Sequence, residues 1–507
     1  MSRASISTGN ITFTSKEGDQ QRTPKARDDE APMHIAILAD FSGRQSQGVC
    51  EADSISSRKA IEVDRDNFEE VFEKLNVSLQ LAVSGTPLKF CEFDDLHPDF
   101  LYRKIDLFEQ FHALKFKLNK PELFQDAADE ILSWQNQQIE AKQTPYEEGG
   151  IPLPENMLDA VLSQHHRATQ ENKPENDIQQ LIKSIVAPYA LVKTDPRLPE
   201  FESAIDEATA HTLRKILHAS TFQDLEANWL GLYFLIRRIE TSSKLKIFIY
   251  DISPEEIIDD TINCETSEQT QLYKLLVEQR QMPGCENYAI VQCNMQMEDD
   301  IDHCQVARLL ADIAAQSQSL ACASASENIA GCESIANTPD PDDWHYDIDA
   351  SFSEAWHTLR NSEASQHLAL CAPRFMLRLP YGKSTSPIES FDFEELPEYG
   401  AHPYYCWGNS AHLLTLLLAQ SYSQSGWQFV PGQLQQVDEL PLHVYREYGE
   451  AHTKACAEIT MTDRAANALA EQGILSVRSV KEATSVILSN MRSLSAKGSL
   501  VFSNKNT

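Results

Sequence analysis

Basic residues are scarce in this 507-residue chain relative to acidic ones. Lys and Arg together number 43 and Asp and Glu number 76, which gives a formal net charge of −33 at pH 7. A surface of this charge repels phosphate backbones and anionic membranes, so we expect no nucleic-acid partner. The same charge opposes self-association unless a basic surface, salt or a partner offsets it. Any assembly must therefore depend on apolar contacts or on strand pairing.

Paired cysteine motifs and long apolar runs are also missing. The 11 cysteines are scattered and form no CxxC motif, which is typical of reduced cytosolic thiols rather than of a disulfide framework. The N-terminus has no apolar segment of a secretory signal, and no later run reaches the ~18 apolar residues of a membrane span. We therefore expect a cytoplasmic protein that does not insert directly into a membrane.

The common catalytic motifs are absent as well. The sequence contains no GxSxG, HExxH or GxGxxG. Gly382-Lys383-Ser384-Thr385 is similar to the end of a phosphate-binding loop, but the first glycine of that loop would stand where the chain has Leu377. A nucleotide-binding enzyme that uses these residues is therefore the less favoured alternative. We predict a protein that is not an enzyme, with no catalytic residues and no cofactor.

Groupings with metal-ligand chemistry are few. They are His303-Cys304, Cys285 with Cys293, and His165-His166, and none has a second pair at ligand spacing. We therefore predict no metal site. Cys371 lies in an apolar segment and is expected to be a core residue, because nothing near it in the sequence would lower the pKa of its thiol.

One stretch in the middle of the chain carries the clearest structural pattern. Apolar and small residues recur at helical spacing from Ile205 to Leu217, which predicts a helix with one buried face. Ser220 followed by Gln223 predicts a capping box that opens a second helix, in which Trp229 lies on the buried face. Alternation of apolar residues in LKIFIY then predicts a strand over residues 245–251. The order helix, helix, strand indicates an α/β core.

Similar patterns predict further elements along the chain. We expect a buried strand in HIAILADF and a strand and then a helix in IEVDRDNFEEVFEKL. VSLQLAV and LKFCEF are expected to form a hairpin or neighbouring strands. YRKIDLFEQFHALKFKL is predicted as one helix, YAIVQCNM as a strand, and HCQVARLLADIAAQSQSLACASAS as a small-residue helix packed against the core. Residues 328–343 indicate an exposed loop. The predicted fold class is α/β (mixed α+β).

The length of the chain exceeds that of one compact core, so we expect more than one domain. We predict a small N-terminal α/β domain and a larger mixed-sheet α/β domain, joined by a linker that carries short helices. The expected boundaries are a disordered tail at 1–31, the small domain at 32–134, the linker at 135–180, the large domain at 181–490 and a short tail at 491–507.

Residues 216–240, ILHASTFQDLEANWLGLYFLIRRIE, also carry a family signature. They resemble the ILHHPxFQxLExxWRGLxxLV signature of the large subunit (the TssC type) of the type VI secretion contractile sheath. The chain departs from that signature at Ala219-Ser220, where the family has His-Pro, and at Leu230, where it has Arg. The matching rare positions are Phe222, Gln223, Leu225, Glu226, Trp229 and Gly231.

Two further blocks resemble the same large subunit. PRFMLRLPYG is similar to its PRxLLRLPYG motif, and YYCWGNSAHLL is similar to its YLWGNAAY motif. These blocks supply the structural signature residues Pro373, Arg374, Arg378, Pro380, Tyr381, Gly382, Trp407, Gly408 and Asn409. We expect Arg374 and Arg378 to join an ion-pair network with buried or interfacial acids such as Glu394 and Glu395. The GDYxF motif of the family, near YAIVQCNM, is missing here.

The N-terminal part resembles the small subunit (the TssB type) of the same sheath. ILADFSGR, SRKAIEVDRDNFEEV and EFDDLHPDFLYRKIDLFEQF are similar to its ADLSGxP, DRxFxEIDxDNFD and DDFxPxxVxRxVxxLxxLL blocks, and they follow in the same order. In the family the two subunits are normally separate chains that form an obligate pair. Here they would be fused in a fixed one-to-one ratio.

The resemblance implies a structural component of the contractile sheath that acts by assembly and conformational change. Such proteins stack as hexameric rings around an inner tube and add strands to their neighbours. The partners implied are other sheath subunits, the tube protein, the baseplate and a recycling unfoldase. A typical large subunit continues for about a hundred residues beyond the point where this sequence ends. An accessory sheath protein that caps, nucleates or docks without polymerising is therefore the alternative.

Overall fold

The computed structural model of the protein describes residues 31–81, 87–120, 198–397 and 402–498, with residue 500 and a few positions between 123 and 131. The linker predicted at 135–180 and all but Ala31 of the predicted N-terminal tail lie outside the described residues. Among the helices that the structure describes, none combines the length and apolar character that crossing a membrane requires.

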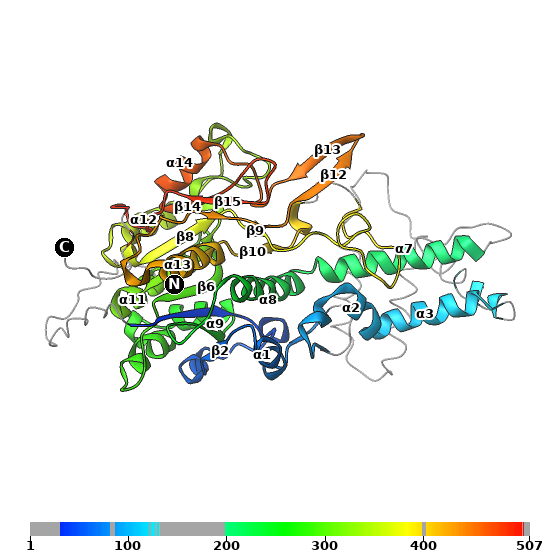
Figure 1. Ribbon diagram of the computed structural model, residues 1–507, viewed down its shortest axis with the longest axis horizontal. Helices are drawn as coiled ribbons and strands as arrows, with labels where there is room; N and C mark the ends of the chain where they lie inside the picture. Colours follow the sequence, from blue (N-terminus) through cyan, green and yellow to red (C-terminus); the bar gives the residue numbers. More distant parts are fainter. Residues whose placement is uncertain are drawn as a thin grey trace, which may run out of the picture.

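A mixed sheet forms the centre of the described structure (Figure 1). Its nine strands are β1 (Met33–Ala39), β2 (Ile61–Val63), β5 (Leu245–Asp251), β6 (Ile290–Met297), β7 (Leu320–Ala325), β8 (Leu368–Ala372), β11 (Gln436–Val437), β14 (Ile474–Ser479) and β15 (Val486–Ser489). They lie in the order β11-β15-β14-β8-β7-β6-β1-β5-β2. The block from β14 to β5 is parallel, whereas β2 and β15 are antiparallel to it at its two ends.

Helices cover both faces of this sheet. The core on one face contains side chains of α8 (Ser220–Arg238) and α13 (Ala411–Ser425). The core on the other contains side chains of α9 (Pro254–Ile262), α11 (Ile301–Ser317), α12 (Ala350–Asn361) and α14 (Asp463–Glu471). Successive side chains of a strand point to opposite faces, so β1 contributes to both cores. Ile35 and Ile37 pack on the side of α8, and Ala36 and Leu38 on the side of α11.

The N-terminal part of the chain is built into the same sheet as the rest. β1 lies between β5 and β6, with Ile35 opposite Ile247 on one side and Ile290 on the other. β2 then pairs with the outer edge of β5. The mixed α/β fold class is confirmed, and the two predicted parts contribute strands to one sheet. The domain boundaries themselves stay predictions.

The remaining elements surround this body. The helices are α1 (Phe68–Lys74), α2 (Pro98–Lys104), α3 (Asp106–Leu118), α7 (Leu198–Leu217) and the short α10 (Gln271–Tyr273). The strands form three pairs, β3 (Ser78–Leu79) with β4 (Leu88–Lys89), β9 (Phe375–Met376) with β10 (Trp407–Gly408), and β12 (His443–Glu447) with β13 (Glu450–Lys454). α3 and α7 lie side by side and extend away from the sheet, on the right of Figure 1. The hairpin predicted in the N-terminal part is confirmed as β3 and β4.

The helix break before residue 220 is confirmed, but the predicted capping box is wrong. The N-cap of α8 is Ala219, and Ser220 is already the first helical residue. The backbone N–H groups of Phe222 and Gln223 donate to the carbonyl of Ala219, and no side chain caps the helix. The helix therefore begins through backbone hydrogen bonds alone, which a residue pattern does not reveal.

Two of the predicted helices are wrong in extent. The one expected over YRKIDLFEQFHALKFKL is split into α2 and α3 by Ile105, which is extended (φ −86°, ψ 119°) and buried. The one expected through residue 326 ends at Gln318, in the left-handed region (φ 54°), and LACASA is the buried strand β7. Small residues suit a crowded central strand as well as a packed helix, so periodicity did not separate the two. The stretch 328–343 is likewise only partly exposed, since Ile329, Cys332 and Ile335 are buried.

Candidate functional site

Trp229 joins the two parts of the chain. Its side chain is fully buried on α8, and its indole Nε1–H donates to the carbonyl oxygen of Phe41, just after β1, at 2.8 Å. Three N-terminal rings surround the indole, with centroid distances of 5.2 Å for Phe41, 5.6 Å for Phe68 and 4.5 Å for Phe72. Aromatic contacts and a buried hydrogen bond therefore hold the N-terminal part against the helix that carries the family signature.

Polar contacts at the end of β5 also join the N-terminal part to the rest of the chain, and together with the packing around Trp229 they form the junction of the two parts. The carboxylate of Glu256 is fully buried and pairs with Arg44 at 2.9 Å and with Arg58 at 2.8 Å. Burial by itself would raise the pKa of Glu256, but hydrogen bonds from Arg44 and from backbone amides outweigh it and lower that pKa. Ser42 Oγ–H also donates to Asp251 at 2.7 Å. Ion pairs and hydrogen bonds, as well as aromatic packing, therefore hold the N-terminal part against the rest of the chain.

A buried ion-pair network connects two signature blocks. The guanidinium of Arg378 donates to Glu226 on α8, with Nε–Oε1 at 2.6 Å, and to Glu395, with Nη1–Oε2 at 2.8 Å. It also lies 4.2 Å from the ring centroid of Tyr381. Glu226 and Glu395 are 2% and 1% exposed, so this one cation pairs with two carboxyl groups that water does not reach. The expected contact of Arg378 with Glu395 is present.

Arg374 has a different partner from the one expected. Its Nε donates to Glu458 at 2.6 Å, and Glu458 also lies 3.4 Å from Nε2 of His402. Glu394 instead accepts a hydrogen bond from the backbone N–H of Lys383 at 3.0 Å. Glu458 stands 84 positions from Arg374, so no local signal could have identified it. The prediction of Glu394 as an arginine partner is wrong.

The segment that is similar to a phosphate-binding loop uses its polar groups within the protein. Besides the bond from its backbone to Glu394, Lys383 places its ammonium 2.8 Å from Asp392. A Cβ on Gly382 would overlap the carboxylate of Glu394, so an anion already occupies the space next to this glycine. A phosphate would meet a carboxylate there, which disfavours nucleotide binding. No group of three or more His, Cys, Asp or Glu side chains in the described part of the chain is arranged to hold a metal ion.

Two further signature glycines also sit where a side chain would overlap a neighbour. A Cβ on Gly231 would overlap the imidazole of His412 on α13, and a Cβ on Gly408 would overlap Leu377. His412 is fully buried, with its Nδ1 2.8 Å from Nε2 of Gln292, and burial lowers its pKa to about 3. Gly231 therefore lets α8 approach a neutral histidine of α13 closely.

The other signature residues lie around these contacts. Phe222, Leu225, Pro373, Pro380 and Trp407 are buried, and Gln223 and Asn409 are half-buried. Asn409 Nδ2–H donates to the carbonyl of Met295 at the end of β6, at 3.2 Å. Cys371 is buried in β8 as expected, and all eleven cysteines, which the structure describes, are free thiols.

The β12–β13 hairpin projects from the body of the protein, at the upper right of Figure 1. Its five residue pairs run from His443 opposite Lys454 to Glu447 opposite Glu450. Tyr448 at its tip is 99% exposed, and Val444 is 54% exposed. Among the described strands these two pair only with each other, so each has an open edge. This hairpin is not among the elements predicted from the sequence, although the alternation of HVYRE and Gly449 after Tyr448 could have indicated it.

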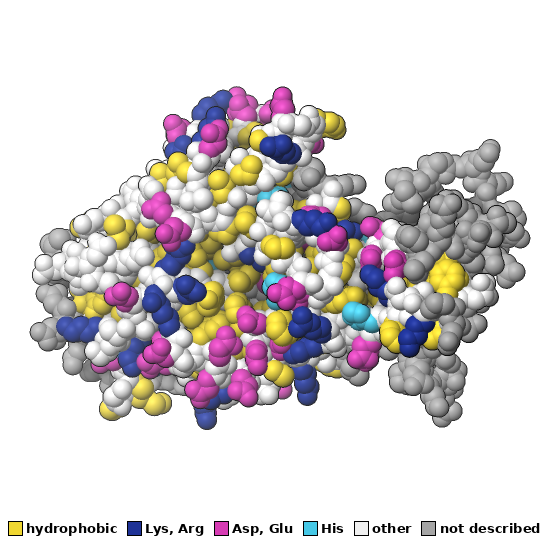
Figure 2. Space-filling view, turned by 45° about the vertical axis from the view of Figure 1, so that its right-hand side comes forward, with side chains coloured by type: hydrophobic (Ala, Val, Ile, Leu, Met, Phe, Trp, Pro, Cys, Tyr) yellow, Lys and Arg dark blue, Asp and Glu magenta, His cyan; other side chains and the backbone are white. Residues whose placement is uncertain are grey.

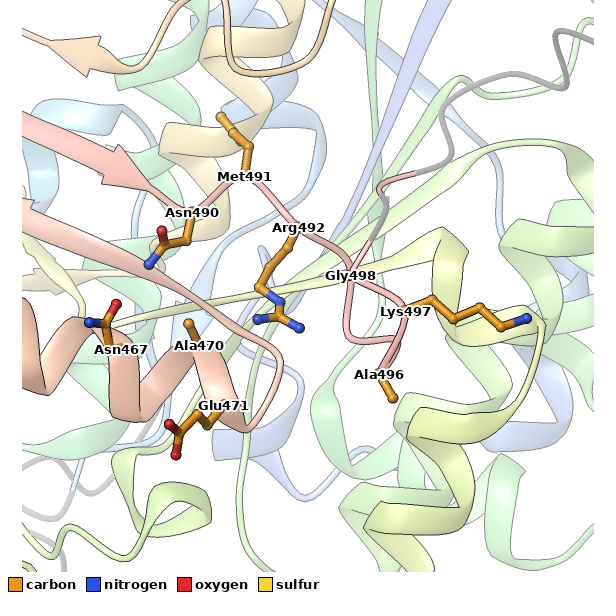
Figure 3. Close-up of a pocket in the computed structure, with 9 residues that line it drawn as sticks. All are labelled: Asn467, Ala470, Glu471, Asn490, Met491, Arg492, Ala496, Lys497 and Gly498. Carbon is orange, nitrogen blue, oxygen red and sulfur yellow. The ribbon is translucent and has the colours of Figure 1, made fainter. Parts of the chain in front are cut away.

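Two hollows complete the candidate features. One, of about 700 Å³, lies beside α14 and is lined by Asn467, Ala470, Glu471, Asn490, Met491, Arg492, Ala496, Lys497 and Gly498. Figure 3 shows that Lys497 extends away from the other lining side chains, so the two basic groups of this hollow, Arg492 and Lys497, do not converge. The second, of about 410 Å³, lies at the carboxyl ends of the parallel strands. The face shown in Figure 2 mixes acidic with basic side chains around hydrophobic ones, with no uniform patch of one charge.

Comparison with known proteins agrees with these signatures. Residues 201–495 match the family model described as "EvpB/VC_A0108, tail sheath N-terminal domain", and residues 9–138 match "Type VI secretion system, VipA, VC_A0107 or Hcp2". The type VI secretion system sheath protein TssC1 of Pseudomonas aeruginosa is 28% identical over 317 residues, or 61% of this chain. The chain spans about 60% of the length of that relative. Since the first model matches more than half of the chain, the protein belongs to the EvpB/VC_A0108 tail sheath family and carries a VipA-type segment at its N-terminal end.

Proposed function

We propose that this protein is a structural subunit of a type VI secretion contractile sheath, with the small-subunit-like and large-subunit-like parts in one chain. It acts by assembly and conformational change around an inner tube, and not by bond chemistry. The observation that carries the proposal is the position of β1, a strand of the VipA-type segment, between β5 and β6 of the sheath-family part. The fused chain thereby supplies both components as one body in a fixed ratio.

The proposed partners are further sheath subunits, met through the β12–β13 hairpin. Its open edges offer unpaired backbone N–H and C=O groups to a strand of a neighbouring copy. Strand pairing of this kind does not require opposite charges, which suits a chain of net charge −33. The tube protein, the baseplate, a recycling unfoldase and a cytoplasmic location belong to the same proposal. The signature residues Glu226, Arg378 and Trp229 are proposed to keep the body rigid during contraction.

Electron microscopy of the purified protein tests this function. We expect tubular or ring-shaped assemblies from the chain alone or after addition of ordinary sheath subunits. A matched variant replaces residues 444–453 by two glycines, which removes the hairpin and keeps its paired ends at His443 and Lys454. This variant should stay folded and monomeric. Tubes from the hairpin variant would contradict the proposed contact. Failure of the intact chain to polymerise, combined with binding to the ends of preformed sheath, would favour the accessory role.

A further inference from the structure

Side-chain contacts at the base of the β12–β13 hairpin attach it to the body of the protein. His443 and Lys454 face each other in the first residue pair of the hairpin. Nδ1 of His443 lies 2.8 Å from the hydroxyl oxygen of Tyr405, and Lys454 Nζ–H donates to Nδ1 of His402 at 2.7 Å. His402 and Tyr405 both lie in the segment just before β10. The direction in which the hairpin projects (Figure 1) is therefore set at its base.

The segment before β10 is itself fixed to the body. Trp407 Nε1–H donates to the carbonyl of His402 at 2.9 Å, and β10 pairs with β9. Four buried side chains form an apolar cluster here, namely Met376, Leu396, Tyr405 and Trp407. Beyond the base of the hairpin, in contrast, most side chains of residues 444–453 are exposed. The segment is thus a firm support, and the hairpin is the part that can move.

His402 connects the hairpin to a buried carboxylate. Its Nδ1 accepts from Lys454, so this nitrogen carries no proton, and the imidazole is neutral with its proton on Nε2. Nε2 lies 3.4 Å from Oε2 of Glu458, which is buried and accepts from Nε of Arg374 at 2.6 Å. The contact therefore runs from β13 through an imidazole to the end of β8.

A second proton on His402 would change this contact. It would occupy Nδ1, the atom that accepts from Lys454, so the hydrogen bond would be lost. Two positive groups would then face each other across the same short distance and repel. Glu458 would hold the imidazolium on its other side. The proton that strengthens the attachment of His402 to the body thus removes the attachment of the hairpin to His402.

The other groups at the base of the hairpin keep their charge when the pH falls. Burial lowers the pKa of His443, with Glu394 opposing, so this histidine stays neutral over the usual histidine range. Burial also lowers the pKa of Lys454, with Glu458 opposing, and a falling pH keeps this amine protonated. Burial raises the pKa of Tyr405, whose hydroxyl therefore also stays protonated.

The carboxyl groups behind His402 also respond to pH. Burial alone would raise the pKa of Glu458, but Arg374 and His402 outweigh it and lower that pKa, so Glu458 stays ionised on acidification. Burial raises the pKa of Glu298 and of Glu327, and Glu458 adds to the rise at Glu327. Proton uptake by these two groups removes negative charge near Arg374, and it leaves Nδ1 of His402 free to accept.

We propose that His402 holds the β12–β13 hairpin in its projecting orientation, and that protonation of His402 releases the hairpin from the body. Histidine is the side chain whose charge ordinarily changes between about pH 5 and 8. The hairpin is therefore held at the upper end of this range and released at the lower end. The device acts within one chain and does not depend on sheath assembly.

Hydrogen–deuterium exchange of the full chain at two pH values tests the device. An isolated two-stranded hairpin is marginally stable at best, so a hairpin released at its base opens more often. We expect the protection of amides in residues 443–454, corrected for the intrinsic exchange rate, to fall by about tenfold from about pH 8 to about pH 5.5, as one charge-assisted hydrogen bond is lost. Light scattering at each pH verifies that the chain is unassembled.

Four variants identify the group that takes up the proton. His402→Gln keeps an acceptor for Lys454 and a donor for Glu458 but does not titrate, so protection should be equal at both pH values. Lys454→Met should show low protection already at the higher pH. His452→Gln, at an exposed histidine on β13, and Glu327→Gln should keep the fall of the unmodified chain. Thermal unfolding verifies that each variant is folded.

Several outcomes would overturn the proposal. Equal protection at both pH values in the unmodified chain would show that no release occurs. A fall that persists in His402→Gln, or that disappears in Glu327→Gln, would assign the proton to another group. If His402→Gln folds poorly, Lys454→Met decides, and protection as high as in the unmodified chain at the higher pH would show that this contact does not hold the hairpin.

Discussion

The junction around Trp229 and the β12–β13 hairpin are opposite in character. At the junction, side chains of both parts of the chain are fully buried, and Trp229 contacts three N-terminal aromatic rings. At the hairpin, Tyr448 is 99% exposed and both strands have an open edge among the described residues. At the junction, the buried side chains and the indole N–H find their partners within the chain. At the hairpin, the outer backbone N–H and C=O groups of both strands have no strand beside them among the described residues. The junction therefore contributes to folding, and the hairpin is free to contribute to assembly.

Trp229→Ala should have the largest effect on folding. It removes a fully buried indole and its hydrogen bond to Phe41, so we expect a loss of about 3–5 kcal/mol in the free energy of unfolding. Urea denaturation followed by circular dichroism measures this change. A loss below ~1 kcal/mol would show that the N-terminal part does not pack on α8 as described.

Arg378→Met should come next, with a loss of about 3 kcal/mol, because Glu226 and Glu395 would be left buried without their counter-ion. The same urea experiment measures it, with Lys383→Met as the control, since the pair of Lys383 with Asp392 is solvent-exposed. The triple variant Glu226→Gln, Arg378→Met, Glu395→Gln should recover part of the loss. If the triple variant is less stable than Arg378→Met alone, the unpaired carboxylates are not the cause of the loss in the free energy of unfolding.

Gly231→Ala should cost about 1–3 kcal/mol, because the added methyl group overlaps His412. A double-mutant cycle with His412→Ala checks the contact. The combined loss should be smaller than the sum of the two single losses, since the smaller side chain makes room for the methyl group. Strict additivity would mean that another neighbour opposes the methyl group.

Tyr448→Ala and Val444→Thr should have the smallest effects on folding, within about 0.5 kcal/mol, because both side chains are exposed on the hairpin. Urea denaturation should show midpoints close to that of the unmodified chain. A loss above ~1 kcal/mol in either variant would mean that the hairpin packs against the body and is not free to pair with another chain.

The sequence was sufficient for elements with a strong local period. The strand at Leu245–Asp251 was predicted to the residue, and the buried face of α8 places Trp229 correctly. Local patterns could not show what lies opposite, since Trp229 binds Phe41 at a separation of 188 positions. They also failed for β7, where Ala, Cys and Ser side chains suit a helix and a strand alike.

For the candidate site as well, the sequence identified single residues but not their long-range partners. The family motifs identified Glu226 and Arg378 separately, and the position of Glu395 near Arg378 in the sequence suggested their pairing. The pairing of Glu226 with Arg378, across 152 positions, required the fold. The hollow at the carboxyl ends of the parallel strands was not predicted at all, because its lining comes from the ends of several strands that only the sheet order brings together.

Hydrogen–deuterium exchange of backbone amides tests the central claim most directly, which is that β1 of the N-terminal part is an inner strand of the shared sheet. Amides of β1 donate into ladders with β5 and β6. We expect them to exchange only on global unfolding, while amides of the β12–β13 hairpin exchange much faster in the unassembled protein. Exchange of β1 as fast as that of the hairpin would contradict the claim, because the two parts of the chain would then fold separately.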